Sequence, residues 1–185
     1  LPMTMLWGST RVSSGCVIGP NTRLTDCAIG ADNVLEEVVG IETTTEAGVT
    51  VGPRAYLRPG TYLCEGAHVG THVEIKKSTV GPDSKVPHLS YIGDATIGTD
   101  VNIGAGSITC NYDGVNKHQT VIGDFTFVGS NTMLVAPVKL GSNVVTGAAS
   151  CITKDVPDGA LAVERNEQKI VEDWTARHFK SKRTS

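Results

Sequence analysis

Aliphatic residues recur at every sixth position along most of this chain, and glycine often follows them. The clearest examples are Val51, Leu57, Leu63, Val69, Ile75, Val80, Val86, Ile92, Ile97, Ile103, Ile122, Val128, Leu134, Leu140 and Ile152, with two steps shortened to five. An amphipathic helix repeats near 3.6 residues and a half-buried strand repeats every 2, so a persistent period of six fits neither. The pattern predicts a polygonal coil, in which each six-residue unit supplies one short strand and one tight corner.

Three such units close one turn of about 18 residues, and successive turns stack as parallel strands about 4.8 Å apart. One aliphatic side chain per unit then points to the axis, and we expect the following glycine to supply the backbone angles of the corner. The alternative, a β-sandwich with regular turns, would show alternation at every second residue and a spacing of 8 to 12 residues. The sequence favours an all-β parallel β-helix.

The six-residue period is interrupted once and then ends. The segment 109–120 lacks the period and contains Asp113-Gly114, a turn signal, so it is predicted to form an extruded loop. Insertions into a strict repeat are often functional. The period stops after Val156, which predicts a β-helix domain over residues 1–163 and a tail over residues 164–185, where Ile170, Val171 and Trp174 indicate a short helix.

Composition excludes several classes of protein. The 185 residues carry 16 Lys and Arg against 19 Asp and Glu, a formal charge of −3, so a broad nucleic-acid-binding surface is not expected. No apolar run approaches the roughly 20 residues that cross a bilayer. The five cysteines form no C-x-x-C pair, which argues against a disulfide framework or zinc cluster and favours a reducing, intracellular compartment.

Counting along the coil identifies side chains that stack on one another. Leu57 and Ile75 are 18 residues apart, so Arg58 lies beside Lys76, and the next residue in this column is Gly93, which is expected to leave open space. Two cations about 5 Å apart repel unless an anion lies beside them. The pair is therefore either a phosphate or carboxylate site, or two solvated surface cations that point apart.

Histidines raise a second possibility, a metal site built from His68, His72 and His88. The coil count places His88 over Thr71 and directs His72 to the opposite face, so three ligands from one stack are geometrically unfavourable. No metal is expected in this domain. By itself His88 is either a structural histidine or a general base.

The period is similar to that of the hexapeptide-repeat acyltransferases, whose fold is a left-handed parallel β-helix that usually trimerises. The handedness comes from this resemblance alone, because general crossover rules favour the right-handed form. Several segments more specifically resemble the acetyltransferase domains of the bacterial bifunctional enzymes that make UDP-N-acetylglucosamine. These segments are Leu57-Arg-Pro-Gly60, Val73-Glu-Ile-Lys-Lys77, His88-Leu-Ser-Tyr-Ile-Gly-Asp94, Asn102-Ile-Gly-Ala-Gly106 and Thr109-Cys-Asn-Tyr-Asp-Gly114.

The resemblance implies N-acetylation of glucosamine 1-phosphate by acetyl-CoA, with His88 as general base, in a site shared between subunits of a cytoplasmic homotrimer. It implies that the following residues bind the sugar phosphate: Arg58, Lys76, Tyr91, Asn102, Lys117 and Glu74. It implies that the following residues line the acetyl-CoA site: Ala105, Asn111, Tyr112, Ser130, Ala148 and Arg165. Asn111 and Ser130 would lie closest to the reacting centre and could donate to the oxyanion.

Three other functions stay open on the sequence. The chain could be a hexapeptide transferase for another amino sugar or acyl donor, a trimeric β-helix scaffold without catalysis, or a metalloenzyme of the carbonic-anhydrase type. The glycine-rich phosphate-binding motif of the bifunctional enzymes' nucleotidyltransferase domain is absent from these 185 residues. We therefore expect no uridylate transfer by them.

Overall fold

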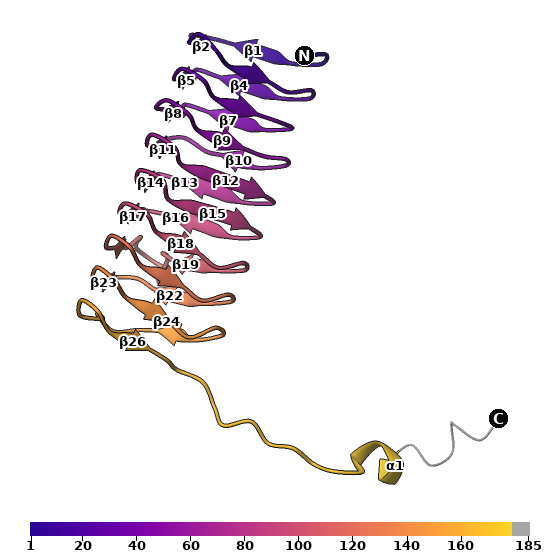
Figure 1. The fold of residues 1–185 in the computed structure, drawn as a ribbon, viewed down its shortest axis with the longest axis vertical. Helices are drawn as coiled ribbons and strands as arrows, with labels where there is room; N and C mark the ends of the chain where they lie inside the picture. The colour runs from indigo at the N-terminus through magenta and orange to yellow at the C-terminus, as the bar shows by residue number, and fades with distance from the viewer. Residues whose placement is uncertain (179–185) are drawn as a thin grey trace, which may run out of the picture.

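Three sheets of short parallel strands form a solenoid of about nine coils in the computed structural model, which describes residues 1–178 (Figure 1). Sheet A contains β1 (Met5–Trp7), β4 (Arg23–Thr25), β7 (Val39–Ile41), β10 (Tyr56–Leu57), β13 (Glu74–Lys76), β16 (Tyr91–Gly93), β19 (Ile108–Cys110), β22 (Met133–Val135) and β25 (Cys151–Ile152). Sheet B contains β2 (Arg11–Val12), β5 (Ala28–Ile29), β8 (Thr44–Thr45), β11 (Tyr62–Leu63), β14 (Thr79–Val80), β17 (Ala95–Ile97), β20 (Thr120–Ile122) and β23 (Val138–Leu140). Sheet C contains β3 (Val17–Ile18), β6 (Val34–Leu35), β9 (Thr50–Val51), β12 (His68–Thr71), β15 (Lys85–His88), β18 (Asn102–Ile103), β21 (Phe127–Val128), β24 (Val145–Thr146) and β26 (Leu161–Ala162).

The chain visits sheets A, B and C in turn, so each strand pairs with the strand one coil later. β10 pairs with β13 through Leu57 and Ile75, and β13 pairs with β16 through Ile75 and Ile92. This confirms the predicted all-β parallel β-helix. We call the corner where the chain leaves sheet A for sheet B the A–B edge, and the corner where it leaves sheet C for sheet A the C–A edge.

The interior of the solenoid is a column of the aliphatic residues that define the period. Leu57, Leu63, Val69 and Ile75 are all fully buried, as are the equivalent residues of the later coils. Buried hydroxyls fill the corners and bond to the backbone. The hydroxyl of Thr61, for example, donates to the carbonyl oxygens of Arg58 at 2.7 Å and Ile75 at 3.1 Å. Small hydroxyl side chains at the corners therefore satisfy backbone carbonyls of two successive coils.

The repeated glycines have a different physical cause from the one predicted. Gly70 and Gly81 do not adopt positive φ, but a Cβ on either would overlap a backbone carbonyl of the next coil, that of Pro87 or Gly98 respectively. The positive φ angles at other corners are taken by residues such as Gly48 and Asp83. Close approach between coils, rather than backbone angle, therefore selects glycine at most of these positions, although Gly52 does have a φ of 115°.

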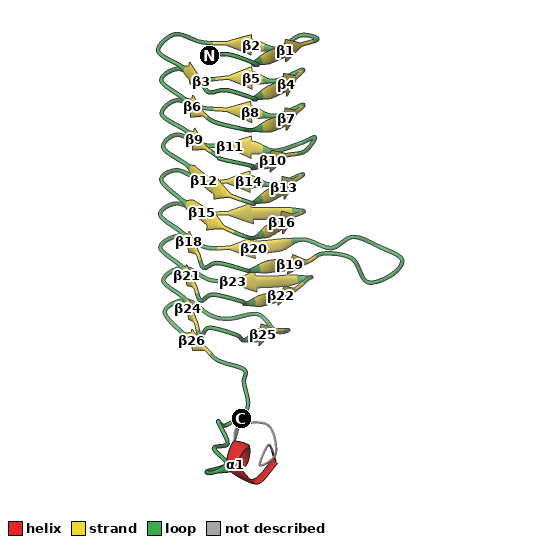
Figure 2. Cartoon of the chain, turned by 90° about the vertical axis from the view of Figure 1, so that its right-hand side faces the viewer, coloured by secondary structure: helices red, strands yellow, loops and turns green. Residues whose placement is uncertain are grey.

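One loop leaves the solenoid at the A–B edge, as Figure 2 shows. It covers residues 111–119, because β19 extends to Cys110 and β20 begins at Thr120. The predicted loop is therefore present but shorter than 109–120, since the strands on both sides retain their ladder bonds.

The solenoid strands end at Ala162, and an extended arm leads to α1 (Trp174–His178). The predicted tail helix is present, but Ile170 and Val171 precede it. The end of the predicted tail, residues 179–185, lies outside the described residues. Within residues 1–178, no helix is long and apolar enough to cross a membrane.

The close contact between coils predicts the effect of adding one methyl group. Gly70→Ala should lower the free energy of unfolding by about 1 to 3 kcal/mol, because its Cβ meets the Pro87 carbonyl group rather than a side chain that can move. Urea unfolding measures this change. Gly48→Asn is the matched control, because its φ of 68° suits asparagine and the nearest atom to an added Cβ is 3.9 Å away. Equal destabilisation of the two variants would contradict the packing explanation.

Candidate functional site

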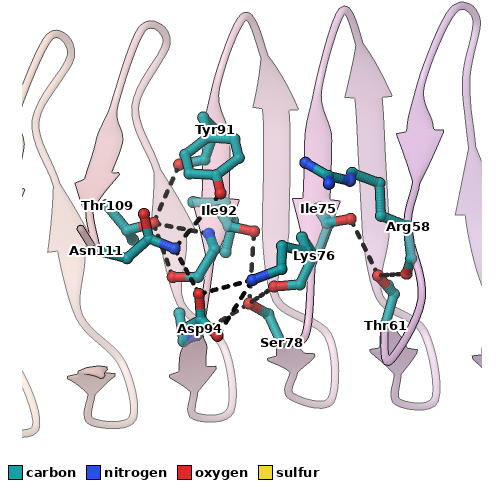
Figure 3. A network of polar contacts seen from close by, with 12 residues as sticks. Arg58, Thr61, Ile75, Lys76, Ser78, Tyr91, Ile92, Asp94, Thr109 and Asn111 are labelled. Carbon is teal, nitrogen blue, oxygen red and sulfur yellow. Dashed lines mark hydrogen bonds and ion pairs between the residues drawn. The ribbon is translucent and has the colours of Figure 1, made fainter. Parts of the chain in front are cut away.

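The two cations that the sequence placed side by side do stack, and each has a carboxylate partner. Arg58 and Lys76 occupy equivalent positions after Leu57 and Ile75, and the amide of Arg58 donates to the Ile75 carbonyl at 2.8 Å. The guanidinium donates to Glu74 Oε1 at 2.8 Å, and Lys76 Nζ lies 3.1 Å from Asp94 Oδ2 (Figure 3). The carboxylates of the protein itself therefore offset the repulsion between the two cations.

Asp94 lies at the centre of this polar cluster at the A–B edge. Its side chain is only 17% exposed, and Oδ2 accepts a second hydrogen bond from Asn111 Nδ2 at 2.5 Å. Burial acts to raise the pKa of Asp94, but the hydrogen bonds from Lys76 and Asn111 and the charges of Lys76 and Lys117 outweigh it. The net effect lowers the pKa, so Asp94 is an anion at neutral pH.

The space beyond Lys76 is filled, which corrects one prediction. Lys76 pairs in register with Gly93, as expected. A Cβ on Gly93, however, would lie 2.5 Å from the Tyr91 hydroxyl and 2.7 Å from Asn111 Nδ2. These two groups lie 3.4 Å apart over the glycine, and Figure 3 shows both side chains turned toward Asp94. Gly93 is thus needed for the arrangement of the site, but it does not leave an open cavity.

The extruded loop adds a third cation to the cluster. Lys117 interacts with Lys76, and this neighbouring charge lowers the pKa of Lys117. Lys117 forms an antiparallel bridge with Tyr112 across the loop. Asp113 stabilises the loop tip, because its carboxylate accepts from the amides of Val115 at 2.8 Å and Asn116 at 2.6 Å and lies 2.6 Å from His118 Nε2. The loop therefore has a defined shape that directs Lys117 toward the cation pair.

A second group of predicted residues forms a column along the C–A edge. The ladder pairs Lys85 with Asn102, Asn102 with Phe127, and Phe127 with Val145. Three positions later in each coil lie His88, Ala105, Ser130 and Ala148, which therefore stack in that order. Backbone hydrogen bonds of 2.7–3.3 Å at the adjoining corner residues hold this stack together.

Arg165 extends this column, Asn102 lies beside it on sheet C, and the His88 ring within it is exposed. Arg165 lies just after β26, and its Nη1 donates to the Ala148 carbonyl at 3.1 Å. Asn102 lies on the outer face of sheet C, within the strand that leads to Ala105. The exposed His88 ring forms no hydrogen bond with another described residue, and Thr71 lies beside it in register, as predicted. The ring is therefore open to contact by a ligand.

The structure thus divides the predicted site residues between two edges of sheet A. The A–B edge holds Arg58, Lys76, Asn111, Tyr112 and Lys117. Glu74 and Tyr91, which begin β13 and β16, contact this group through Arg58 and Asn111 respectively. The C–A edge holds His88, Ala105, Ser130, Ala148 and Arg165, with Asn102 on the adjoining face of sheet C.

Sequence reasoning did not single out Asp94, although a signal was present. Lys76 stacks on Gly93, so the residue after Gly93 had to lie at the same corner.

Among residues 1–178, no three His, Cys, Asp or Glu side chains are grouped in a way that could hold a metal ion, and all five cysteines are free thiols.

Comparison with known proteins gives strong similarity over nearly the whole chain. A bifunctional GlmU protein of Heliobacterium modesticaldum is 56% identical over 179 residues, which cover 97% of this chain and 39% of that protein. The GlmU protein of Carboxydothermus hydrogenoformans is 57% identical over 173 residues, which cover 94% of this chain and 39% of that protein. This chain corresponds to the hexapeptide-repeat region of the GlmU proteins. It spans about two fifths of the length of these GlmU relatives.

Two other comparisons agree with a hexapeptide-repeat β-helix. A family model described as the hexapeptide repeat of succinyl-transferase matches residues 119–154. The solved structure of LpxA from Acinetobacter baumannii superposes with a TM-score of 0.69 at 18% identity, covering 97% of this chain and 76% of that chain. At this identity the superposition establishes the β-helix fold shared with LpxA and nothing further.

The lowered pKa of Asp94 predicts a pH-dependent contribution to stability. A carboxylate whose pKa falls below its ordinary value of 3.8 on folding stabilises the protein above that pH and loses this contribution as the pH falls through the folded value. Asp94→Asn should therefore lower the free energy of unfolding by about 1.5 to 3 kcal/mol at pH 7. The difference from the parent chain should shrink below about pH 4. Denaturant unfolding between pH 3 and 8 measures it, and a difference independent of pH would contradict the ionic explanation.

Proposed function

We propose that this region transfers the acetyl group of acetyl-CoA to the amine of glucosamine 1-phosphate, which supplies N-acetylglucosamine 1-phosphate for UDP-N-acetylglucosamine, a cell-wall precursor. The observation that supports this most directly is the convergence of three cations, Arg58, Lys76 and Lys117, at one edge of sheet A. Arginine binds phosphate through a two-pronged contact and lysine through a point charge, so the cluster suits a phosphomonoester.

The proposed chemistry needs no nucleophile from the protein. The sugar amine attacks the thioester carbon of acetyl-CoA, the carbon–nitrogen bond forms, and the carbon–sulfur bond breaks as coenzyme A leaves. His88 accepts the proton lost by the amine as a general base. Asn111 and Ser130 carry donors that suit the oxyanion formed on the thioester oxygen.

The column at the C–A edge has the properties of a coenzyme A surface. Ala105, Ser130 and Ala148 are small, so an elongated ligand can lie close to the stacked corners. Arg165 adds a positive charge at one end, where it suits a phosphate of the cofactor. We also propose that the protein acts as a cytoplasmic homotrimer, because the residues predicted for each substrate are divided between two edges of one copy. Asn102 lies apart from the other sugar-phosphate residues, and Asn111 and Tyr112 lie apart from the other acetyl-CoA residues.

Coenzyme A release with three acceptors tests the proposal. The protein should release thiol from acetyl-CoA rapidly with glucosamine 1-phosphate and slowly with glucosamine or glucosamine 6-phosphate, because only the first places its phosphate among the three cations. Thiol release with another amino sugar instead would favour a different hexapeptide transferase. Absence of release with every acceptor would leave a non-catalytic scaffold as the better explanation.

The role of His88 gives a separate prediction. His88→Ala should lower kcat by about 10² or more, while binding of glucosamine 1-phosphate survives, because general-base catalysis contributes about 10² to 10⁴. Steady-state kinetics at pH 7.5 measures the rate and calorimetric titration measures binding. His72→Ala, at the neighbouring exposed corner, is the matched control and should retain the parental rate. An unchanged rate in His88→Ala would remove this residue from the mechanism.

A further inference from the structure

One carboxylate joins two parts of the site that come from different parts of the chain. Asp94 accepts from Lys76 in β13, 18 residues earlier, and from Asn111, which starts the extruded loop 17 residues later. The Asn111 side chain is nearly buried, and its remaining hydrogen bond is the 3.4 Å contact with the Tyr91 hydroxyl. Within residues 1–178, Asp94 provides the only ionic partner of Lys76 and the shortest contact of Asn111.

The backbone of Asp94 is fixed at the same two places. Its amide donates to the Lys76 carbonyl at 3.0 Å, and its carbonyl accepts from the amide of Thr120 at 3.1 Å. Thr120 begins β20, where the loop returns to the solenoid. The side chain of Asp94 therefore contacts Asn111, the first residue of the loop, and its main chain contacts Thr120, the residue that follows the loop. Its φ of 50° lies in the left-handed region, which asparagine and glycine tolerate and most other residues do not.

We propose that Asp94 is a positioning residue that couples the phosphate-binding lysine to the loop asparagine. This inference rests on the proposed function. Asp94 sets the position of Lys76 for the sugar phosphate and the orientation of Asn111 for the reacting carbonyl. Loss of the carboxylate therefore weakens phosphate binding through Lys76 and slows acetyl transfer through Asn111.

Electrostatics alone predicts the opposite sign for one of these effects. A negative charge beside a phosphate site repels the phosphate, so its removal should strengthen binding if Asp94 acted only through its charge. Positioning predicts weaker binding, because without the carboxylate Lys76 is no longer held where it contacts the phosphate. The direction of the change in KM therefore separates the two explanations.

Two double-mutant cycles test the proposal on the acetyl-CoA and glucosamine 1-phosphate reaction. Asp94→Asn should raise KM for the sugar phosphate about 5- to 20-fold in the parent chain, and less than about 2-fold when Lys76→Ala is already present. It should lower kcat about 10-fold in the parent chain, and less than about 2-fold when Asn111→Ala is present. Non-additivity in both cycles is the expected result. A general loss of folded protein would instead change the kinetics by the same factor in every background.

Asp100→Asn is the matched control. Asp100 is an exposed corner residue with a φ of 52°, and its side chain forms no hydrogen bond with another described residue. This variant should keep the parental KM and kcat. If Asp94→Asn does not give folded protein, Asp94→Gly replaces it in both cycles, because glycine also accepts the φ of 50°.

The possible failures are distinct. Additive effects in the cycles, a lowered KM in Asp94→Asn, or unchanged kinetics in a variant with reduced thermal stability would each overturn the positioning role. Absence of thiol release by the parent chain would instead overturn the proposed function itself.

Discussion

The stacking of one coil on the next at the distance of a β-ladder is the constraint on which the rest of this structure depends. It brings residues 17 or 18 apart into contact, as with Leu57, Ile75 and Ile92. It excludes a Cβ at positions such as Gly70, where the next backbone passes too closely. It also limits the interior of each unit to one large aliphatic side chain and a smaller buried residue two positions earlier, such as Val73 before Ile75. The core is therefore long and thin, and most of its stability comes from contacts between neighbouring coils.

The same constraint decides how charged residues can be used. Outward side chains in one column are held about 5 Å apart, so two cations in adjacent coils need anions close by. Glu74 and Asp94 fill this need for Arg58 and Lys76. A cluster with this internal balance keeps its cations in place before a ligand binds.

The periodic parts of the molecule could be predicted from the sequence in detail, whereas for the non-periodic parts only their presence could be predicted, not their side-chain contacts. The buried aliphatic column, the stacking of Arg58 on Lys76 and the position of His88 beside Thr71 all follow from counting. The filled space over Gly93 did not follow, because it depends on how Tyr91 turns and where the loop places Asn111. The contact of Lys117 with Lys76 did not follow from counting either, since no period fixes the course of a nine-residue excursion from the coil; only the family resemblance placed both lysines in one site.

A rigid prism also limits where a two-substrate reaction can take place. The polar cluster and the His88 column lie at opposite ends of the sheet A strands, and a laddered sheet cannot bend to bring its own edges together. A second copy can do so if its C–A edge faces the A–B edge of the first. Such a contact joins two different surfaces, so it closes only as a ring. The proposed trimer is therefore the kind of assembly that lets each copy lend one edge to its neighbour. The loop at 111–119 projects from the A–B edge, which would face that neighbour (Figure 2).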